Sequence, residues 1–493
     1  MAGFPRHPDD FSSLFKRPDG VVDAWPPTQL AYLGFYLARL KCATVLNETH
    51  YIDRDYIEDL ALFHGRSLRS YPNHCQRLHF FSTTFNQERW DAMASAKGDA
   101  HERASARLQG GYLGFCVIRP LPASPVGRTV LRTFGGTSEG GMKRAFGAVR
   151  DYNVHLGAFR LGIRGLAFQQ QDRGVSACAT TALWCAIQKT APMERLAVVS
   201  PAAITESASR YFLADGRALP SEGLTIHQVC EATRATGLSP LLIRSVSYEH
   251  DRAQLLGYLS SGFAPVLALQ SIGGEGHAVC GVGLKLGAVQ PPADPKQRYC
   301  DAATTVRGLY LHDDRLGPYA AADIFPYTLQ QDGKTRVVTG VSIKWPDEGE
   351  SQLAILLALV IPVPTKLRLT VARMRDLGTS IADAVALAMP RFTRKVTLHC
   401  HFETGVDYLG RAPRYGLTGA GLRQLTSRTV LSRYLGVIRL TVGEETLLDV
   451  LLDTTESGSN PPVVACVARM RVRPKEFLIL EFFATKLAAD FIR

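Results

Sequence analysis

The chain has 493 residues, of which 46% are hydrophobic and 20% are charged, and its formal net charge is +11 with a pI near 9.2. These values are close to the averages of soluble globular proteins, so they exclude a fibrous or largely disordered chain. The length predicts two or three compact units, because single cores rarely grow to this size. The basic excess is small for such a length. It leaves a nucleic-acid partner open without predicting one.

The first residues contain acids and prolines where a secretory signal needs a basic start and an apolar core. The most apolar stretch, Leu353–Pro364, is shorter than the roughly 20 residues of a spanning helix and contains prolines, so we expect a buried strand or helix and no membrane partner. The ten cysteines are dispersed without a CxxC pair, which is typical of a reducing compartment. We therefore expect a cytoplasmic protein.

Three regions follow from the patterns along the chain. Residues 1–134 form an N-terminal mixed α/β region, with a helix predicted over Leu30–Leu46 and a strand over Tyr112–Ile118. The segment Gly135–Gly141 predicts a flexible loop. It lacks the Gly-Lys-Ser/Thr ending of a phosphate-binding loop, so a nucleotide site is not predicted there.

Residues 145–345 alternate between helical and strand patterns and contain the reactive residues, so they form the predicted core. Residues 346–493 form a C-terminal strand-rich region. Its predicted strands are Lys395–Phe402, Leu435–Val442 and Pro462–Arg473.

The first reactive residue is Cys178. A polar segment that contains a glycine changes at Cys178 into the apolar spacing of a buried helix. Cys178 is therefore expected at or near a helix N-terminus, where unpaired N–H groups and the macrodipole favour the nucleophilic thiolate. Small neighbours, Ala177 and Ala179, leave room for a substrate carbonyl. A glutamine shortly upstream can donate to a developing oxyanion together with a backbone N–H at the helix start.

A histidine and an aspartate complete the pattern. His277 follows a glycine-rich turn and opens an apolar strand, which positions it as a general base for the thiol. A later apolar strand ends in Asp313 and Asp314. Either acid can accept from the second imidazole nitrogen and fix its orientation. The choice between them stays open, with Asp313 favoured.

The order glutamine, cysteine, histidine, aspartate resembles that of the papain-like cysteine peptidases, and within them the double-glycine leader peptidases, the bacteriocin-processing domains of bacterial exporters. Gln171, Cys178, His277 after Gly276, and Asp313 fill the family's places over about residues 160 to 320. The resemblance implies an α+β papain-like core, with a nucleophile helix packed on an antiparallel sheet. It also implies a Cys-His-Asp triad and no metal or organic cofactor.

Several features depart from the family pattern. Gln171 lies seven residues before Cys178, one more than usual, so the neighbouring Gln170 and Asp172 are alternatives for the family's glutamine position. Ala179 replaces the glycine that commonly follows the cysteine, and Asp314 stands where proline commonly follows the acid. The long interval between histidine and acid contains a proline-rich run, residues 290–295, which we interpret as an inserted loop.

The expected activity is that of an intracellular thiol protease, a hydrolase that cleaves protein or peptide amide bonds. The same triad also supports deamidases, transglutaminases and acyltransferases, and an inactive binding module for a protein or nucleic acid is a further alternative. Size, compartment and the extra regions suggest a regulated bacterial toxin or defence effector with a regulatory protein partner.

Other reactive residues have simpler interpretations. A lone buried cysteine such as Cys185 usually belongs to the core, so only the combination around Cys178 predicts catalysis. His399 and His401 share one face of a predicted strand and form a potential metal pair without a second ligand pair. A second cluster, His74, Cys75 and His79, is similar. Arg469, Arg471 and Arg473 alternate along a predicted strand and are interpreted as a solvated face.

Overall fold

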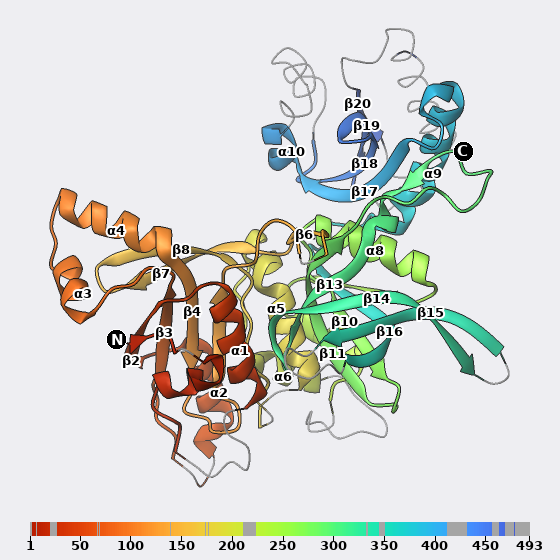
Figure 1. The fold of residues 1–493 in the computed structure, drawn as a ribbon. Coiled ribbons are helices and arrows are strands. Elements are labelled where there is room, and N and C mark those ends of the chain that lie inside the picture. Colours follow the sequence, from red (N-terminus) through yellow and green to blue (C-terminus); the bar gives the residue numbers. More distant parts are fainter. Residues whose placement is uncertain are drawn as a thin grey trace.

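The structure is a computed structural model. It describes residues 2–5, 7–19, 27–66, 68, 70–138, 140–172, 174–175, 177–210, 223–331, 334–344, 351–411, 431–455, 463–468 and 478. Within these ranges the chain is a mixed α+β fold whose strand pairs are antiparallel, apart from one short parallel pair. The N-terminal elements lie to one side of the central ones, and the C-terminal elements lie above them (Figure 1).

The N-terminal region is built on a five-stranded sheet in chain order. Its strands are β1 Ala2–Gly3, β2 Thr44–Tyr51, β3 Cys75–Phe81, β4 Tyr112–Ile118 and β5 Val126–Leu131. Its helices are η1 Pro8–Leu14, α1 Thr28–Arg39, α2 Arg54–Leu62, η2 His64–Arg66, α3 Gln87–Ala94 and α4 Asp99–Gly111. The predicted strand Tyr112–Ile118 is confirmed as β4.

The helix predicted over Leu30–Leu46 is right in its first part only. α1 ends at Arg39, and β2 begins at Thr44. Lys41 adopts a left-handed conformation with φ of 59°, and the N–H of Cys42 donates to the carbonyl of Leu37 at 3.0 Å. This is a common way to end a helix. The apolar spacing continues into β2 because the strand is buried as well.

The region also extends beyond residue 134. A hairpin of β7 Arg150–Leu156 and β8 Phe159–Gly165 packs against β5 and α4. Thr129 and Phe168 then pair their backbones in an isolated bridge. The chain therefore leaves the N-terminal sheet only a few residues before Cys178.

The central region contains a closed antiparallel sheet. β10 pairs with both β11 and β16, which closes six strands into a ring in the order β10, β11, β13, β14, β15, β16, while β9 and β6 attach outside it. The strands are β6 Lys143–Ala145, β9 Ser239–Arg244, β10 Val266–Ser271, β11 Gly276–Leu286, β13 Val306–Asp313, β14 Gly317–Gln331, β15 Lys334–Lys344 and β16 Ser351–Val363. The helices are α5 Cys178–Met193, α6 Pro201–Ser209, α7 Ile226–Ala235 and α8 Tyr248–Ser260.

The predicted division at residues 345 and 346 does not match this sheet. β16 pairs with β10, β15 and β9, so the central sheet continues to Val363. The apolar stretch Leu353–Pro364 is thereby assigned as a strand. Composition does not reveal which strands pair, so a boundary at residue 345 falls inside one sheet.

The C-terminal region is a second five-stranded sheet. Its strands are β12 Cys300–Asp301, β17 Val396–Thr404, β18 Tyr434–Val442, β19 Glu445–Asp453 and β20 Val463–Ala468. Its helices are η3 Ala302–Thr305, α9 Val371–Ala388, η4 Pro390–Phe392 and α10 Gly405–Arg411. The predicted strands correspond to β17, β18 and β20. Arg469, Arg471 and Arg473 lie outside the described residues.

The helix α9 was missed by sequence reasoning. Its buried residues recur at helical spacing, among them Val371, Met374, Ile381 and Val385. This periodicity was readable in the sequence. The expectation of a strand-rich region was therefore incomplete.

The segment between His277 and Asp313 connects the central and C-terminal regions. Residues 290–295 contain no helix or strand, as expected of an inserted loop. Further along, β12 pairs in parallel with β17. Asp301 accepts from Arg375 at 2.5 Å, and Arg394 donates to the carbonyl of Pro292 at 2.6 Å. The insertion thus anchors the C-terminal sheet.

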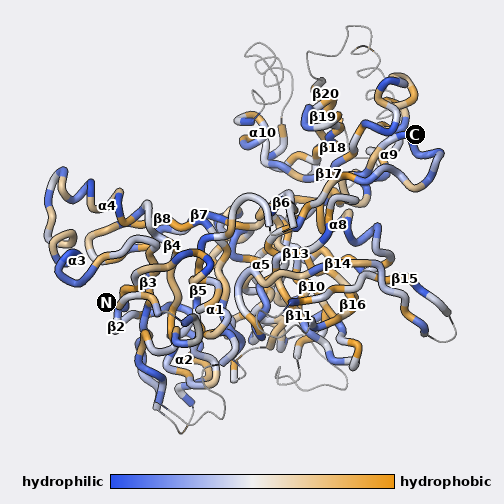
Figure 2. Tube along the Cα trace, in the orientation of Figure 1, coloured by the Kyte–Doolittle hydropathy of each residue, from blue (hydrophilic) through white to orange (hydrophobic). Residues whose placement is uncertain are grey.

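Hydropathy follows this arrangement. Figure 2 shows hydrophobic residues concentrated in central strands such as β10 and β16, while α3, which has no buried residue, is mostly hydrophilic. In the part of the chain that the structure describes, none of the helices has the length and apolar character needed to cross a membrane.

The contact between α8 and the C-terminal region yields a stability prediction. A Cβ at Gly257 would lie 2.7 Å from the Val371 side chain and 3.0 Å from the Cys400 carbonyl oxygen. We expect Gly257→Ala to lower the free energy of unfolding by about 1–3 kcal/mol through overpacking. Gly410→Ala is the control, because a methyl group at that position of α10 would have nothing within 4 Å. Equal urea midpoints for the two variants would contradict the close approach.

Candidate active site

The cysteine lies where the sequence predicts. Cys178 is the first residue of α5, and Ala177 precedes it in an extended conformation. The Ala177 N–H donates to Thr180 Oγ1 at 3.3 Å, which fixes the start of the helix. α5 packs against β10, β11 and β16, and most of its side chains are buried. Cys178 itself is partly exposed at the start of this packed helix.

The histidine and the acid come from neighbouring strands. His277 is the second residue of β11, and Asp313 is the last residue of β13, which pairs with β11. His277 Nε2 lies 3.0 Å from Asp313 Oδ1. The same oxygen accepts from the backbone N–H of Arg315 at 3.0 Å. Strand pairing and the following turn therefore hold the carboxylate against the ring.

The second ring nitrogen of His277, Nδ1, is the one available to Cys178. Nδ1 of His277 is buried and has no well-aligned hydrogen-bond partner among the described residues. The Cys178 side chain nevertheless lies close enough to contribute to the raised pKa of His277. The two facts agree if the thiol is within reach of Nδ1 but poorly aligned, which is common in active sites without substrate. Cys178, His277 and Asp313 are thus brought together in triad order.

Electrostatics keep the ring protonated. Burial lowers the pKa of His277, but the charge and hydrogen bond of Asp313, with smaller contributions from Cys178 and Asp314, raise it to about 10. Burial alone would raise the pKa of Asp313, yet His277 holds it below its ordinary value. At neutral pH the pair is therefore an imidazolium and a carboxylate. The imidazolium can stabilise a neighbouring thiolate.

The structure distinguishes the two adjacent acids. Asp313 contacts the ring, whereas the Oδ1 atom of Asp314 is buried with no hydrogen-bond partner among the described residues. Burial and the charge of Asp313 raise the pKa of Asp314 to about 7. The backbone carbonyl of Asp314 accepts from Gln29 of α1 at 2.7 Å. Asp313 is therefore the orienting acid of the candidate triad.

The same three side chains also have a spacing compatible with a metal ion. Ligand atoms of His277, Asp313 and Asp314 lie within 4.8 Å of one another. His277 Nε2 already donates directly to Asp313, and a metal ion bound at Nε2 would replace that bond. The hydrogen-bonded arrangement favours the triad. A chelator therefore belongs among the controls of any activity measurement.

The segment before Cys178 is held by the N-terminal region. The side chain of Gln170 accepts from the Val126 N–H at 3.2 Å and donates to the Ala123 carbonyl at 3.3 Å. Asp172 accepts from His64 Nε2 at 2.6 Å and from the Gly174 N–H at 3.0 Å. Both competitors of Gln171 therefore have structural roles.

Gln171 itself is partly buried in this segment and remains the candidate for the oxyanion site. The contact between His64 and Asp172 was not found by sequence reasoning. His64 lies on η2, far from Asp172 in the chain, and no local pattern links them.

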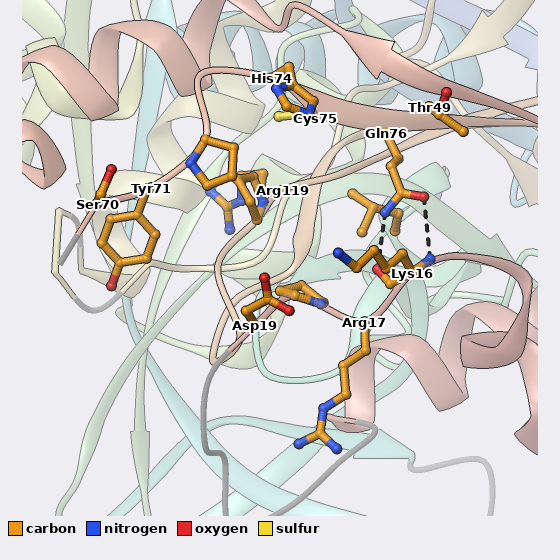
Figure 3. Close-up of a pocket in the computed structure, with 14 residues that line it drawn as sticks. Lys16, Arg17, Asp19, Thr49, Ser70, Tyr71, His74, Cys75, Gln76 and Arg119 are labelled. Atoms are coloured by element: carbon orange, nitrogen blue, oxygen red, sulfur yellow. Dashed lines mark hydrogen bonds between the residues drawn. The ribbon is translucent and has the colours of Figure 1, made fainter.

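A separate cavity lies beside β3 (Figure 3). Its volume is about 500 Å³, and its lining includes Lys16, Tyr71, His74 and Arg119 but no triad residue. Figure 3 shows Gln76 bonded twice to the Lys16 backbone, which ties the N-terminal segment to the sheet.

The potential metal cluster at this strand has a structural explanation. His79 hydrogen-bonds to the Tyr112 hydroxyl and to Glu48, each at 2.9 Å. Both ring nitrogens are therefore occupied. Among the described residues, His74, Cys75 and His79 do not belong to any three-ligand group with metal spacing.

Comparison with known proteins adds no family. No family model matches the chain, and no curated protein is similar enough to match.

The first prediction from this site concerns alkylation. Cys178 is partly exposed beside an imidazolium, whereas burial raises the pKa of the Cys42 and Cys400 thiols to about 12. Iodoacetamide at pH 7 is expected to modify Cys178 first, as measured by peptide mass mapping. His277→Gln is expected to slow the reaction roughly tenfold or more, because an unassisted thiol is only a few per cent ionised. Cys42→Ser should leave the fast phase unchanged. Faster alkylation at any other cysteine would contradict the site.

The two acids give a matched pair of variants. Asp313→Asn removes the charge that keeps His277 protonated, so alkylation of Cys178 at pH 7 should slow by roughly tenfold. Asp314→Asn replaces a carboxyl that is only partly ionised at pH 7 with a neutral group of the same shape, and its rate should stay within about threefold of wild type. Slower alkylation in Asp314→Asn than in Asp313→Asn would assign the orienting role to Asp314.

Proposed function

We propose that this chain is a cysteine peptidase with a papain-like core, in which Cys178 is the nucleophile. The observation that carries the proposal is the 3.0 Å contact between Asp313 and His277 Nε2. It leaves Nδ1 of the ring for a cysteine at a helix N-terminus. A cysteine, an oriented imidazole and an acid in this order are the requirements of thiol acyl chemistry.

The arrangement of elements supports the papain-like assignment. α5 carries the nucleophile at its first residue and packs on an antiparallel sheet. The sheet supplies the histidine from the start of β11 and the acid from the end of the adjacent β13. This is the division between helix and sheet that the sequence resemblance implies.

The proposed reaction begins with attack of Cys178 Sγ on the amide carbonyl carbon. The oxyanion that forms accepts hydrogen bonds from the Cys178 N–H and the Gln171 side chain. His277 then gives its proton to the departing amine as the C–N bond breaks, leaving a thioester on Cys178. Water attacks the thioester and His277 takes a proton from it; the C–S bond then breaks, which releases the carboxylic acid and restores the thiolate of Cys178 beside the imidazolium.

Asp313 acts through His277. It keeps Nε2 occupied, so the nitrogen facing Cys178 is the one that exchanges protons. It also stabilises the imidazolium in each half of the reaction. The N-terminal region contributes indirectly, because His64 and Arg119 hold the segment that carries Gln171.

The biological setting is part of the proposal. Dispersed cysteines suit a reducing cytoplasm, and a protease acting there requires restraint. The N-terminal and C-terminal regions flank the core and offer contact surfaces for a regulatory protein. We infer a regulated bacterial protease, a toxin or defence effector, whose substrate is a protein or peptide.

The decisive experiment compares wild type and Cys178→Ala in bacterial cells by mapping new protein N-termini. New N-termini should appear with wild type and with Cys42→Ala, and disappear with Cys178→Ala. Activity of the purified protein should persist in a chelator, because the proposed mechanism uses no metal. Identical N-termini in all three strains would contradict the peptidase. A deamidated or cross-linked glutamine in place of a cleaved bond would instead assign the thioester to another acyl transfer.

A further inference from the structure

A second cavity lies where the central region meets the C-terminal sheet. Its volume is about 700 Å³, within the range of small-molecule sites. The lining comes from α5, from the end of α8, and from β17, α10 and β18. It includes His399 and His401, the histidine pair that the peptidase mechanism does not use.

The two histidines present unpaired ring nitrogens. Their rings stack with centroids 4.6 Å apart. His401 Nε2 bonds to Glu403 Oε1 at 2.8 Å, while Nδ1 of His401 and Nε2 of His399 are buried without a hydrogen-bond partner among the described residues. The His401 side chain is only 6% exposed. A buried polar atom without a partner is unfavourable, so a ligand that satisfies it gains affinity.

Cationic side chains dominate the lining. They are Arg164, Lys189, Arg411, Arg433 and Arg439, against two acids, Glu403 and Asp407. Arg439 pairs with Asp449, outside the lining, at 2.8 Å, whereas Arg411 pairs with Glu403, inside the lining, at 2.9 Å. Lys189 instead donates to the Gly147 carbonyl at 2.6 Å. Because cationic side chains outnumber acids in the lining, the formal charge of the lining is positive.

The positive charge of the lining favours an anion over a metal ion as the ligand. Burial, then the neighbouring His401, Arg439 and Arg375, hold the pKa of His399 well below its ordinary value, so the ring is neutral in a positive field. Such a field opposes a dication. Among the described residues, the pair also does not belong to any group of three ligands with metal spacing. The sequence-based idea of a metal pair is therefore not supported by its surroundings.

The cavity lies between the helix α5 and the C-terminal sheet. Lys189 lies on α5, the helix that begins with Cys178. Arg433, next to β18, donates to the Met193 carbonyl at the end of that helix. A ligand in the cavity contacts the nucleophile helix and the C-terminal sheet at once.

We propose that this cavity binds a small molecule that carries phosphate groups, held by Arg433, Arg411 and Lys189 with the N–H of His399. Charge-assisted hydrogen bonds from arginine to phosphate are strong and directional. The volume accommodates a ligand of nucleotide size. The site is independent of the proposed peptidase activity, because none of its residues belongs to the triad.

The test is calorimetric titration of the full chain with inorganic tripolyphosphate at physiological salt. Wild type is expected to bind one tripolyphosphate. His399→Gln and Arg433→Gln should each raise the Kd about tenfold, the loss of one charge-assisted contact. Arg107→Gln, an exposed site on α4, removes the same charge elsewhere and should leave the Kd unchanged. Because Arg433 is more than half exposed, its variant is expected to fold, which thermal unfolding checks.

Several outcomes would overturn the proposal. One is absence of binding at millimolar tripolyphosphate, and another is an equal loss in Arg107→Gln, which reports a general charge effect. Stoichiometric binding of zinc that His399→Gln abolishes would establish a metal site instead. Binding of a long RNA in the absence of tripolyphosphate binding would point to a nucleic-acid surface. All of these readouts are independent of peptidase activity, so the two proposals fail separately.

Discussion

The hydrogen-bonded ion pair between Asp313 and His277 is the interaction on which the proposed chemistry depends. It joins the end of β13 to the start of β11, two paired strands of the closed sheet. It keeps the ring protonated and leaves one nitrogen for Cys178. The geometry persists because the sheet closes on itself, which leaves these strands little freedom to separate.

Each of the other regions supports this pair from a different side. α1 of the N-terminal region donates from Gln29 to the Asp314 carbonyl, next to the orienting acid. His64 and Arg119 hold the segment before Cys178. The insertion between histidine and acid pairs through β12 with β17 and anchors the C-terminal sheet. A regulator that moves either flanking region therefore acts on elements that contact the core directly.

Features that depend on local sequence patterns could be predicted from the sequence. The start of α5 at Cys178 follows from a switch in apolar spacing, and β11 and β13 follow from short apolar runs bounded by turns. The choice of Asp313 needed the structure, since two adjacent acids differ only in which one reaches the ring. The continuation of the sheet to Val363 and the contact between His64 and Asp172 depend on pairing between distant segments. No local pattern encodes such pairing.

The most direct test of the account is the pKa of His277, measured by NMR titration of histidine-labelled protein. The structure predicts a value raised to about 10 in wild type, because Asp313 and Cys178 favour the imidazolium. The same measurement on Asp313→Asn should give a clearly lower value. A wild-type pKa near 6.5, the ordinary value of histidine, would contradict the ion pair and the triad built on it.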